Sequence, residues 1–90
     1  MSTYTSEVGT SKQVDEGEFD ERLRELPPSA KLVAKVLELE SPLSQSELAE
    51  ESLLPDRTVR YALNRLDEAG LVESRYSFVD ARKRVYALVQ

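Results

Sequence analysis

The strongest helical pattern of hydrophobic and polar residues lies between residues 55 and 70. At about 100° per residue, the apolar residues fall on one face of a helix: Val59, Ala62, Leu63, Leu66 and Ala69. The opposite face carries two guanidinium groups, a phenol and an amide, on Arg57, Arg60, Tyr61 and Asn64. Pro55 or Asp56 is expected to begin the helix and Gly70 to end it. The pattern therefore predicts a helix with one face in a core and a basic outer face.

The outer face of this predicted helix has the chemistry of a DNA-reading surface. Arginine can bind guanine O6 and N7 through two hydrogen bonds, and asparagine can bind adenine N6 and N7 in the same way. Arg60 and Asn64 are one helical turn apart, so both would face the same groove. The alternative is a solvated helix face that happens to carry arginines. The segments on either side decide between these two interpretations.

The segment before this helix completes a helix-turn-helix pattern. Leu43 can form a strand of one or two residues, and Ser44 and Glu47 have the spacing of a capping box. The helix that follows is expected to reach about Ser52, with Leu48 and Ala49 turned inward. Residues 52–55 would then turn the chain into the basic helix. Two short helices joined by a tight turn are the helix-turn-helix arrangement.

After Gly70 the pattern becomes alternating, which is typical of strands. Residues 71–78 and 84–89 read as two strands, and residues 79–83 as the loop of a hairpin. The hairpin resembles the wing of a winged helix. Its tip holds three basic residues, Arg82, Lys83 and Arg84, and a single acidic residue, Asp80. Charges at a hairpin tip often serve solubility alone. Two basic surfaces on neighbouring elements make DNA binding the better interpretation.

The N-terminal third is expected to begin with a tail and to contain two helices. Residues 1–17 are rich in Ser, Thr, Glu and Gly and are predicted to be disordered. Residues 18–26 form a short amphipathic helix that Pro27 and Pro28 end. A second helix would run from the cap residue Ser29 to about Glu40. Its first apolar stripe, expected to face the core, contains Ala30, Val33, Ala34 and Leu37.

A second apolar stripe on this helix, Leu32, Val36 and Leu39, needs a partner of its own. One possibility is that the short helix covers it within the same chain, through Phe19, Leu23 and Leu26. The other is a homodimer interface formed by Phe19, Leu23, Leu32, Val36 and Leu39. We expect some mixture and favour dimerisation, because an isolated short helix covers little surface.

Composition narrows the classes of function. Ninety residues indicate one domain, expected at residues 18–90. The chain has no Cys and no His, which removes thiolate and imidazole metal sites and the usual general base. We therefore expect no enzyme, no cofactor and no metal site. No apolar run is long enough to cross a membrane and no signal peptide is visible, so a cytoplasmic protein is expected.

The net charge of −5 conceals an uneven distribution. Residues 1–55 hold 5 Lys and Arg against 12 Asp and Glu, whereas residues 56–90 hold 7 against 5. Positive charge is therefore concentrated in the part that contains the basic helix and the wing. The acidic total, with Arg more frequent than Lys, is similar to proteins of salt-loving archaea, so a halophilic archaeal source is expected.

Three segments together resemble a known family of regulators. They are Leu43–Ala49, Thr58–Leu66 and Ala69–Val72, and they resemble the winged helix-turn-helix of MarR-like and ArsR-like transcriptional regulators, most of all small archaeal relatives. In the MarR pattern the wing has Asp followed closely by an Arg that enters the minor groove; Asp80, Arg82 and Arg84 are similar. The long C-terminal dimerisation helix of MarR proteins has no counterpart here, so a dimer is expected from the N-terminal elements. The metal-binding Cys and His clusters of many ArsR proteins are absent.

We therefore predict an α+β winged helix-turn-helix, a three-helix core with a β-hairpin wing and a short N-terminal helix. Its expected function is sequence-specific binding of double-stranded DNA as a transcriptional regulator, as a homodimer, with no identifiable small-molecule effector. The rival is a winged helix that binds proteins within the transcription machinery. The acidic net charge and the expected exposure of Tyr76 and Phe78 favour it. The predicted DNA-binding residues are Ser44, Gln45, Ser46, Arg57, Thr58, Arg60, Tyr61, Asn64, Arg65, Arg82, Lys83 and Arg84.

Overall fold

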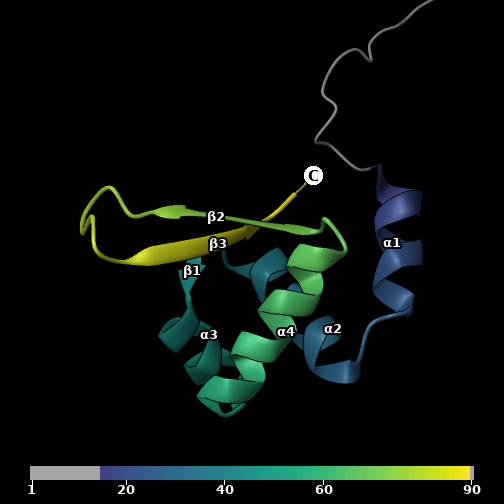
Figure 1. The fold of residues 1–90 in the computed structure, drawn as a ribbon, viewed down its shortest axis with the longest axis horizontal. Helices are drawn as coiled ribbons and strands as arrows, with labels where there is room; N and C mark the ends of the chain where they lie inside the picture. Colours follow the sequence, from purple (N-terminus) through teal and green to yellow (C-terminus); the bar gives the residue numbers. More distant parts are fainter. Residues whose placement is uncertain (1–14, 90) are drawn as a thin grey trace, which may run out of the picture.

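The computed structural model describes residues 15–89, and their elements follow the predicted order (Figure 1). Most of the predicted N-terminal tail, residues 1–14, lies outside this range. The elements are α1 (Glu16–Arg24), α2 (Pro28–Leu39), β1 (Leu43–Ser44), α3 (Gln45–Ser52), α4 (Asp56–Glu68), β2 (Val72–Tyr76) and β3 (Arg84–Leu88).

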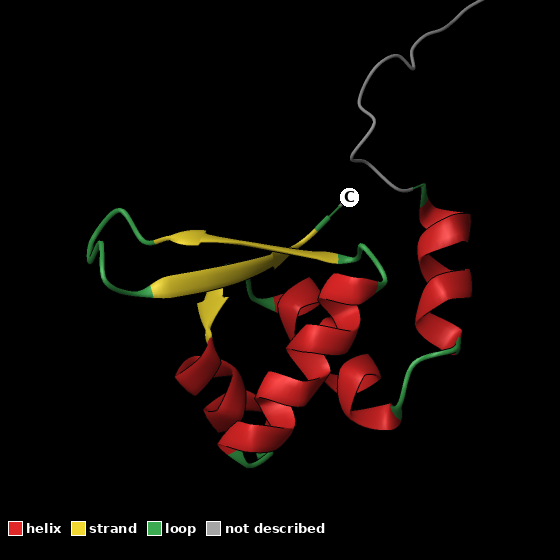
Figure 2. Ribbon diagram, viewed as in Figure 1, coloured by secondary structure: helices red, strands yellow, loops and turns green. Residues whose placement is uncertain are grey.

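Helices α2, α3 and α4 pack together, and a small sheet lies across one end of them (Figure 2). The sheet is antiparallel in the order β1-β3-β2, with Leu43 opposite Tyr86 and Val72 opposite Leu88. The hairpin of β2 and β3 projects beyond α3 and α4, as a wing does (Figure 1). The α+β winged helix-turn-helix arrangement is therefore confirmed.

The core joins the three helices to the base of the wing. Its largest fully buried side chains come from all of these elements: Val33, Leu37, Leu48, Val59, Leu66 and Leu71. Each such side chain contributes roughly 1.5–3 kcal/mol when it is removed from water. The predicted inner faces of α2 and α4 are confirmed, because Ala30, Val33, Ala34 and Leu37 are buried on α2 and Val59, Ala62, Leu63 and Leu66 on α4.

Two helix starts differ from the sequence prediction. Helix α2 begins at Pro28 with Pro27 as its cap residue, so Ser29 lies inside the helix. Proline suits the first helical position because its missing N–H would have no partner there. Helix α1 begins at Glu16 instead of residue 18, because the Asp15 side chain accepts a hydrogen bond from the Glu18 N–H at 2.8 Å. Residues 16 and 17 are therefore helical, not part of a disordered tail.

Helix α1 does not cover the second stripe of α2. Phe19 is 5% exposed and belongs to the chain's own core, so it is not available to a dimer interface as the sequence suggested. Leu23 is half-buried against the same core. Val36 also packs partly against it, whereas Leu32 and Leu39 stay 40% and 76% exposed. The described chain therefore covers this stripe only in part, and Leu39 is the residue left most exposed.

Candidate nucleic-acid interface

The candidate interface is built on α4, whose outer surface is held by its buried face. Val59, Ala62 and Leu66 have no exposed surface, which fixes the rotation of the helix about its axis. Because side chains three and four residues apart share a face, the residues on the opposite side point to solvent. Arg57, Arg60, Tyr61 and Asn64 are all exposed there, and we call these four residues the recognition face.

Part of the recognition face lies beside the wing and the start of α3. Arg60 and Asn64 line a hollow of about 120 Å³ together with Gln45 of α3, Ser74 of β2, and Arg84 and Tyr86 of β3. A neighbouring hollow of about 330 Å³ shares Gln45, Arg84 and Tyr86 and is also lined by Ser44, Ser46 and Lys83. Seven of the twelve predicted site residues therefore meet along one concave surface.

The other five predicted residues lie around this surface. Arg57 and Tyr61 are exposed on the recognition face, and Thr58 is half-buried beside it. Arg65 lies on the same helix, nearer its end, and Arg82 is at the tip of the wing. None of these five lines either hollow.

The arginines of the interface differ in whether the protein itself already binds them. The Arg65 guanidinium lies 3.0 Å from the Tyr61 hydroxyl and 3.5 Å from Glu68. By contrast, Arg57 and Arg60 make no ion pair within residues 15–89. The charge on these two side chains is therefore free to meet a ligand.

The two basic residues near the wing tip are paired in the unbound protein. The Arg82 guanidinium lies 3.4 Å from Asp80, and the Lys83 ammonium lies 3.4 Å from Glu47 of α3. Exposed pairs of this kind contribute little to stability. Either cation can therefore exchange its carboxylate for a phosphate at small cost.

The wing contributes two tyrosines that the sequence analysis did not place in the interface. Residues 74, 76, 84 and 86 share one face of the hairpin, because Ser74 pairs with Tyr86 and Tyr76 with Arg84. The Arg84 guanidinium lies 5.6 Å from the centre of the Tyr76 ring. The phenols of Tyr76 and then Tyr86 raise the pKa of Arg84. Residues two apart in a strand share a face, so the sequence could have placed Tyr86 beside the predicted site residue Arg84.

The N-terminus of α3 uses Ser44 as a cap. The Ser44 hydroxyl accepts a hydrogen bond from the Glu47 N–H at 3.2 Å, and the Ser44 N–H donates to the Glu47 carboxylate at 2.8 Å. The capping box is therefore confirmed. Ser44 is only 5% exposed, so it stabilises the helix and does not offer its hydroxyl to a phosphate. Gln45 is half-buried and Ser46 exposed, and these two stay as surface candidates.

The same capping box sets the charge state of Glu47. The hydrogen bond from the Ser44 N–H is the main cause that lowers the pKa of the Glu47 carboxyl, and Lys83 lowers it further. Glu47 is therefore a stable negative charge beside the helix N-terminus, where a carboxylate is favoured.

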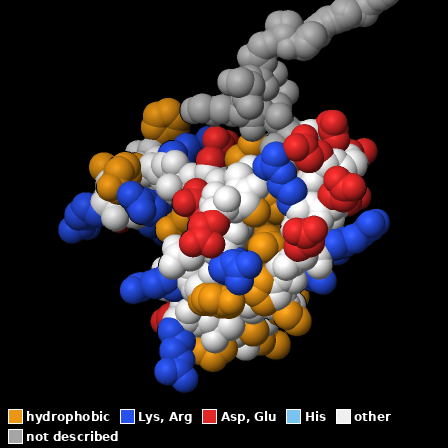
Figure 3. Space-filling view, turned by 45° about the vertical axis from the view of Figure 1, so that its right-hand side comes forward, with side chains coloured by type: hydrophobic (Ala, Val, Ile, Leu, Met, Phe, Trp, Pro, Cys, Tyr) orange, Lys and Arg blue, Asp and Glu red, His pale blue; other side chains and the backbone are white. Residues whose placement is uncertain are grey.

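Helix α1 connects to the far end of α4. The Arg22 guanidinium donates a hydrogen bond to the Ala69 carbonyl at 2.8 Å and pairs with Glu18 at 2.7 Å. Ala69 caps the C-terminus of α4, where a cation is favourable because the last carbonyls carry partial negative charge. In the view of Figure 3, acidic side chains gather near α1 with Lys and Arg among them, and further side chains of both signs lie toward the wing.

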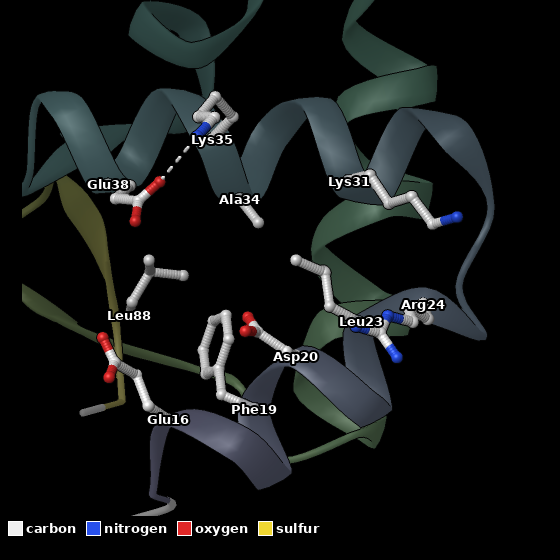
Figure 4. A pocket seen from close by; sticks show the side chains of 10 residues that line it. All are labelled: Glu16, Phe19, Asp20, Leu23, Arg24, Lys31, Ala34, Lys35, Glu38 and Leu88. Atoms are coloured by element: carbon white, nitrogen blue, oxygen red, sulfur yellow. Dashed lines mark hydrogen bonds and ion pairs between the residues drawn. The ribbon is translucent and has the colours of Figure 1, made fainter.

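A third hollow, of about 460 Å³, separates α1 from α2 (Figure 4). Phe19, Leu23 and Leu88 point into it, and the charged groups at its edge include both signs. The Lys35 ammonium lies 3.1 Å from the Glu38 carboxylate on this edge. The concave surface on α4 also carries both signs, because Asp56, Asp67 and Glu73 line it beside its basic residues.

Two other kinds of site are missing from the part of the chain that the structure describes. Residues 15–89 contain no group of three or more His, Cys, Asp or Glu side chains that could hold a metal ion. No helix within this range is long and apolar enough to cross a membrane.

The sequence of residues 35–73 matches a family model described as winged helix-turn-helix DNA-binding. These residues include α3, α4 and the start of β2, which form most of the concave surface. A search of curated proteins finds no match.

Solved structures of bacterial regulators share the fold. A probable transcriptional regulator from Pseudomonas aeruginosa superposes with a TM-score of 0.69 at 22% identity, over 78% of this chain and 54% of that one. Streptococcus pneumoniae FabT in complex with DNA gives 0.66 at 21%, over 74% and 47%. The S. aureus MepR-DNA complex gives 0.66 at 19%, over 77% and 59%. The chain thus spans about half the length of these proteins, and the fold is that of a winged helix-turn-helix.

Proposed function

From a winged helix-turn-helix whose concave surface brings together Arg60, Lys83 and Arg84, we propose that this protein binds double-stranded DNA in a sequence-specific manner and regulates transcription. One observation carries the proposal. Arg60 and Asn64 of α4 line the same hollow as Gln45 of α3 and Arg84 of the wing. Helix α4, which would enter the major groove, therefore lies beside the wing, which would contact the adjacent DNA backbone. A winged helix needs this arrangement to bind DNA.

The residues divide by the part of DNA that they would contact. The recognition face would approach base edges in the major groove, where Arg and Asn discriminate between base pairs. Arg65, Thr58, Gln45 and Ser46 lie nearer the edge and would bind phosphates. On the wing, Arg82, Lys83 and Arg84 would bind phosphates or enter the minor groove. The similarity of the fold to FabT and MepR, both solved with DNA, supports this arrangement.

The proposal includes a homodimer formed through α2. Leu32 and Leu39 lie on one side of this helix and are 40% and 76% exposed. Two copies related by a two-fold axis would place two α4 helices on half-sites about one helical turn apart. Such a dimer in the cytoplasm would suit a regulator of transcription.

The central experiment separates base readout from phosphate binding. A duplex enriched by the wild-type protein from a random library is titrated against a scrambled duplex at several salt concentrations. Arg60→Ala or Asn64→Ala should cost roughly 1–3 kcal/mol on the enriched duplex and reduce discrimination. Lys83→Ala should weaken both duplexes alike and lower the salt slope by about one. Lys31→Ala, which removes the same charge from the exposed side of α2, is the control.

The outcomes discriminate between DNA readout and its alternatives. Identical behaviour of Arg60→Ala and Lys83→Ala would contradict base readout by α4. If the library yields no enriched duplex and neither variant changes DNA affinity, the protein-interaction module replaces the DNA-binding proposal. The salt series extends to molar concentration, because a chain from a salt-loving archaeon would still be folded there.

A further inference from the structure

The tip of the wing carries two adjacent apolar side chains that nothing in the described chain covers. Phe78 and Val79 are fully exposed, and Tyr76 nearby is more than half exposed. Single exposed apolar residues are normal on protein surfaces. An exposed pair at the outermost point of a hairpin differs, since it forms the first part of the wing to meet another molecule.

Hydrogen bonds hold the tip in one shape. The Ser77 N–H donates to the Lys83 carbonyl at 2.8 Å and the Lys83 N–H to the Asp80 carbonyl at 2.9 Å. The Ser77 hydroxyl oxygen accepts from the Val79 N–H at 3.1 Å, and the Asp80 carboxylate accepts from the Arg82 N–H at 3.0 Å. The loop therefore presents Phe78 and Val79 on a closed backbone frame, so little order needs to be gained on binding.

The position of the tip matches the spacing of the DNA grooves. At about 3.3 Å per residue, the chain from Val72 to Phe78 extends on the order of 20 Å from the end of α4. Neighbouring major and minor grooves are separated by half of a ~34 Å turn. With α4 in the major groove, the wing tip therefore reaches the adjacent minor groove.

We propose that Phe78, with Val79 beside it, enters the minor groove and wedges against a base-pair step next to the α4 footprint. Apolar wedges of this kind partly unstack a step and bend the duplex. Pyrimidine–purine steps are the easiest to deform, so the wedge selects a TA or CA step without a hydrogen bond to a base. Arg82 and Lys83 on the same loop hold the flanking phosphates. This inference rests on the proposed DNA-binding function.

The positive charge near the tip favours DNA over a partner with a purely apolar surface. Two cations, Arg82 and Lys83, share the loop with a single acidic residue, Asp80, and Arg84 follows at the start of β3. The hairpin face beside the loop carries Tyr76 and Arg84. A polyanion with flat, stackable groups fits this combination of cations and aromatic rings.

The experiment measures affinity and bending on a duplex that wild-type protein enriches from a random library. Fluorophores at the two ends report the bend, and 2-aminopurine at the TA or CA step beside the α4 footprint reports unstacking. Phe78→Ala should weaken binding about tenfold, abolish the bend and the 2-aminopurine signal, and leave the salt slope unchanged because no charge is removed. Phe78→Leu should restore part of the bend. Ala81→Ser, an exposed change in the same loop, is the control.

Each result identifies which idea fails. If the wild-type protein enriches no duplex, the proposed function itself fails. If it enriches one, but Phe78→Ala binds it with the same affinity, bend and 2-aminopurine signal, the wedge is overturned while DNA binding stands. If Phe78→Ala leaves DNA binding unchanged but abolishes flotation with vesicles of anionic lipid, the tip is a membrane contact and the wedge is likewise overturned. An unchanged melting temperature of Phe78→Ala shows that lost binding is not lost folding.

Discussion

At the scale of single residues, two positions within residues 15–89 have the left-handed backbone that disfavours side chains, and only one of them was visible in the sequence. Gly70 follows the end of α4 with φ of 75°, as its place after the apolar pattern predicted. Leu53 has φ of 62° in the turn between α3 and α4. No local propensity predicts a leucine there. The hydrogen bonds of the turn impose it, including Leu53 N–H to the Ala49 carbonyl at 2.9 Å and the Ser52 hydroxyl to the Leu48 carbonyl at 2.6 Å.

Gly70→Val should destabilise the protein by about 1 kcal/mol or more. A β-branched side chain avoids this φ, and a Cβ at Gly70 would lie 3.1 Å from the Arg22 guanidinium that caps α4. For a domain of this size, that loss lowers the melting temperature by roughly 4–8 °C. Gly17→Ala is the control: Gly17 is helical, a Cβ there would lie at an ordinary 3.6 Å from Asp15, and alanine favours helices. Equal melting temperatures for Gly70→Val and the wild type would show that the end of α4 does not require a glycine at this position.

At the scale of elements, the sequence predicted types and order well and boundaries less well. The capping box of α3 and the buried face of α4 follow local rules, so both were predicted. The strands are shorter than expected, because residues 77–83 form the hydrogen-bonded loop instead of extending β2. Ser77 and Asp80 are residues whose side chains bind nearby backbone groups, and this turn chemistry was the missed signal.

Glu47→Gln should destabilise α3 only while the carboxyl is charged. Glutamine can still accept the Ser44 N–H, so the change removes the charge beside the helix N-terminus, worth about 0.3–1 kcal/mol. Because the pKa of Glu47 is lowered in the folded protein, its contribution is present above the unfolded pKa near 4.5. It is lost as the pH falls through the lower folded value. Melting curves of the variant and the wild type should therefore differ at pH 7 and converge in acid.

Glu50→Gln tests whether this effect belongs to the helix start. It removes the same charge from an exposed position nearer the end of α3, where a carboxylate is not favoured. We expect no loss of stability from it at pH 7. Equal losses from both variants, or a Glu47→Gln loss that persists in strong acid, would show that the charge at the cap is not the cause.

At the scale of the whole molecule, the sequence predicted which faces are apolar but not which surfaces they meet. The periodicity of α1 indicated that Phe19, Leu23 and Leu26 are buried. Their placement depends on long-range contacts, such as that of Arg22 with the Ala69 carbonyl, 47 residues away. The concave surface is similar: Arg60, Asn64 and Arg84 were predicted one by one, and Tyr86 joined them only through the register of the sheet.

The dimer is the prediction that belongs to this scale. The wild-type chain should sediment as a dimer, and the double change Leu32→Glu and Leu39→Glu should give a folded monomer, because four buried carboxylates would then oppose one another across the two-fold axis. Val36 is less suitable for the test, since it packs partly against the core and its loss would weaken the fold. Lys31→Glu is the control, as it adds negative charge to an exposed position on the same helix. Circular dichroism checks that the monomer is folded. A wild-type chain that remains monomeric at high concentration would rule out the dimer. A double variant that remains dimeric would show that the dimer contact lies elsewhere.

The monomeric variant should also bind a single half-site with the sequence preference of the dimer. Its affinity for the full site should be much lower, because the two half-sites would no longer be bound by linked subunits.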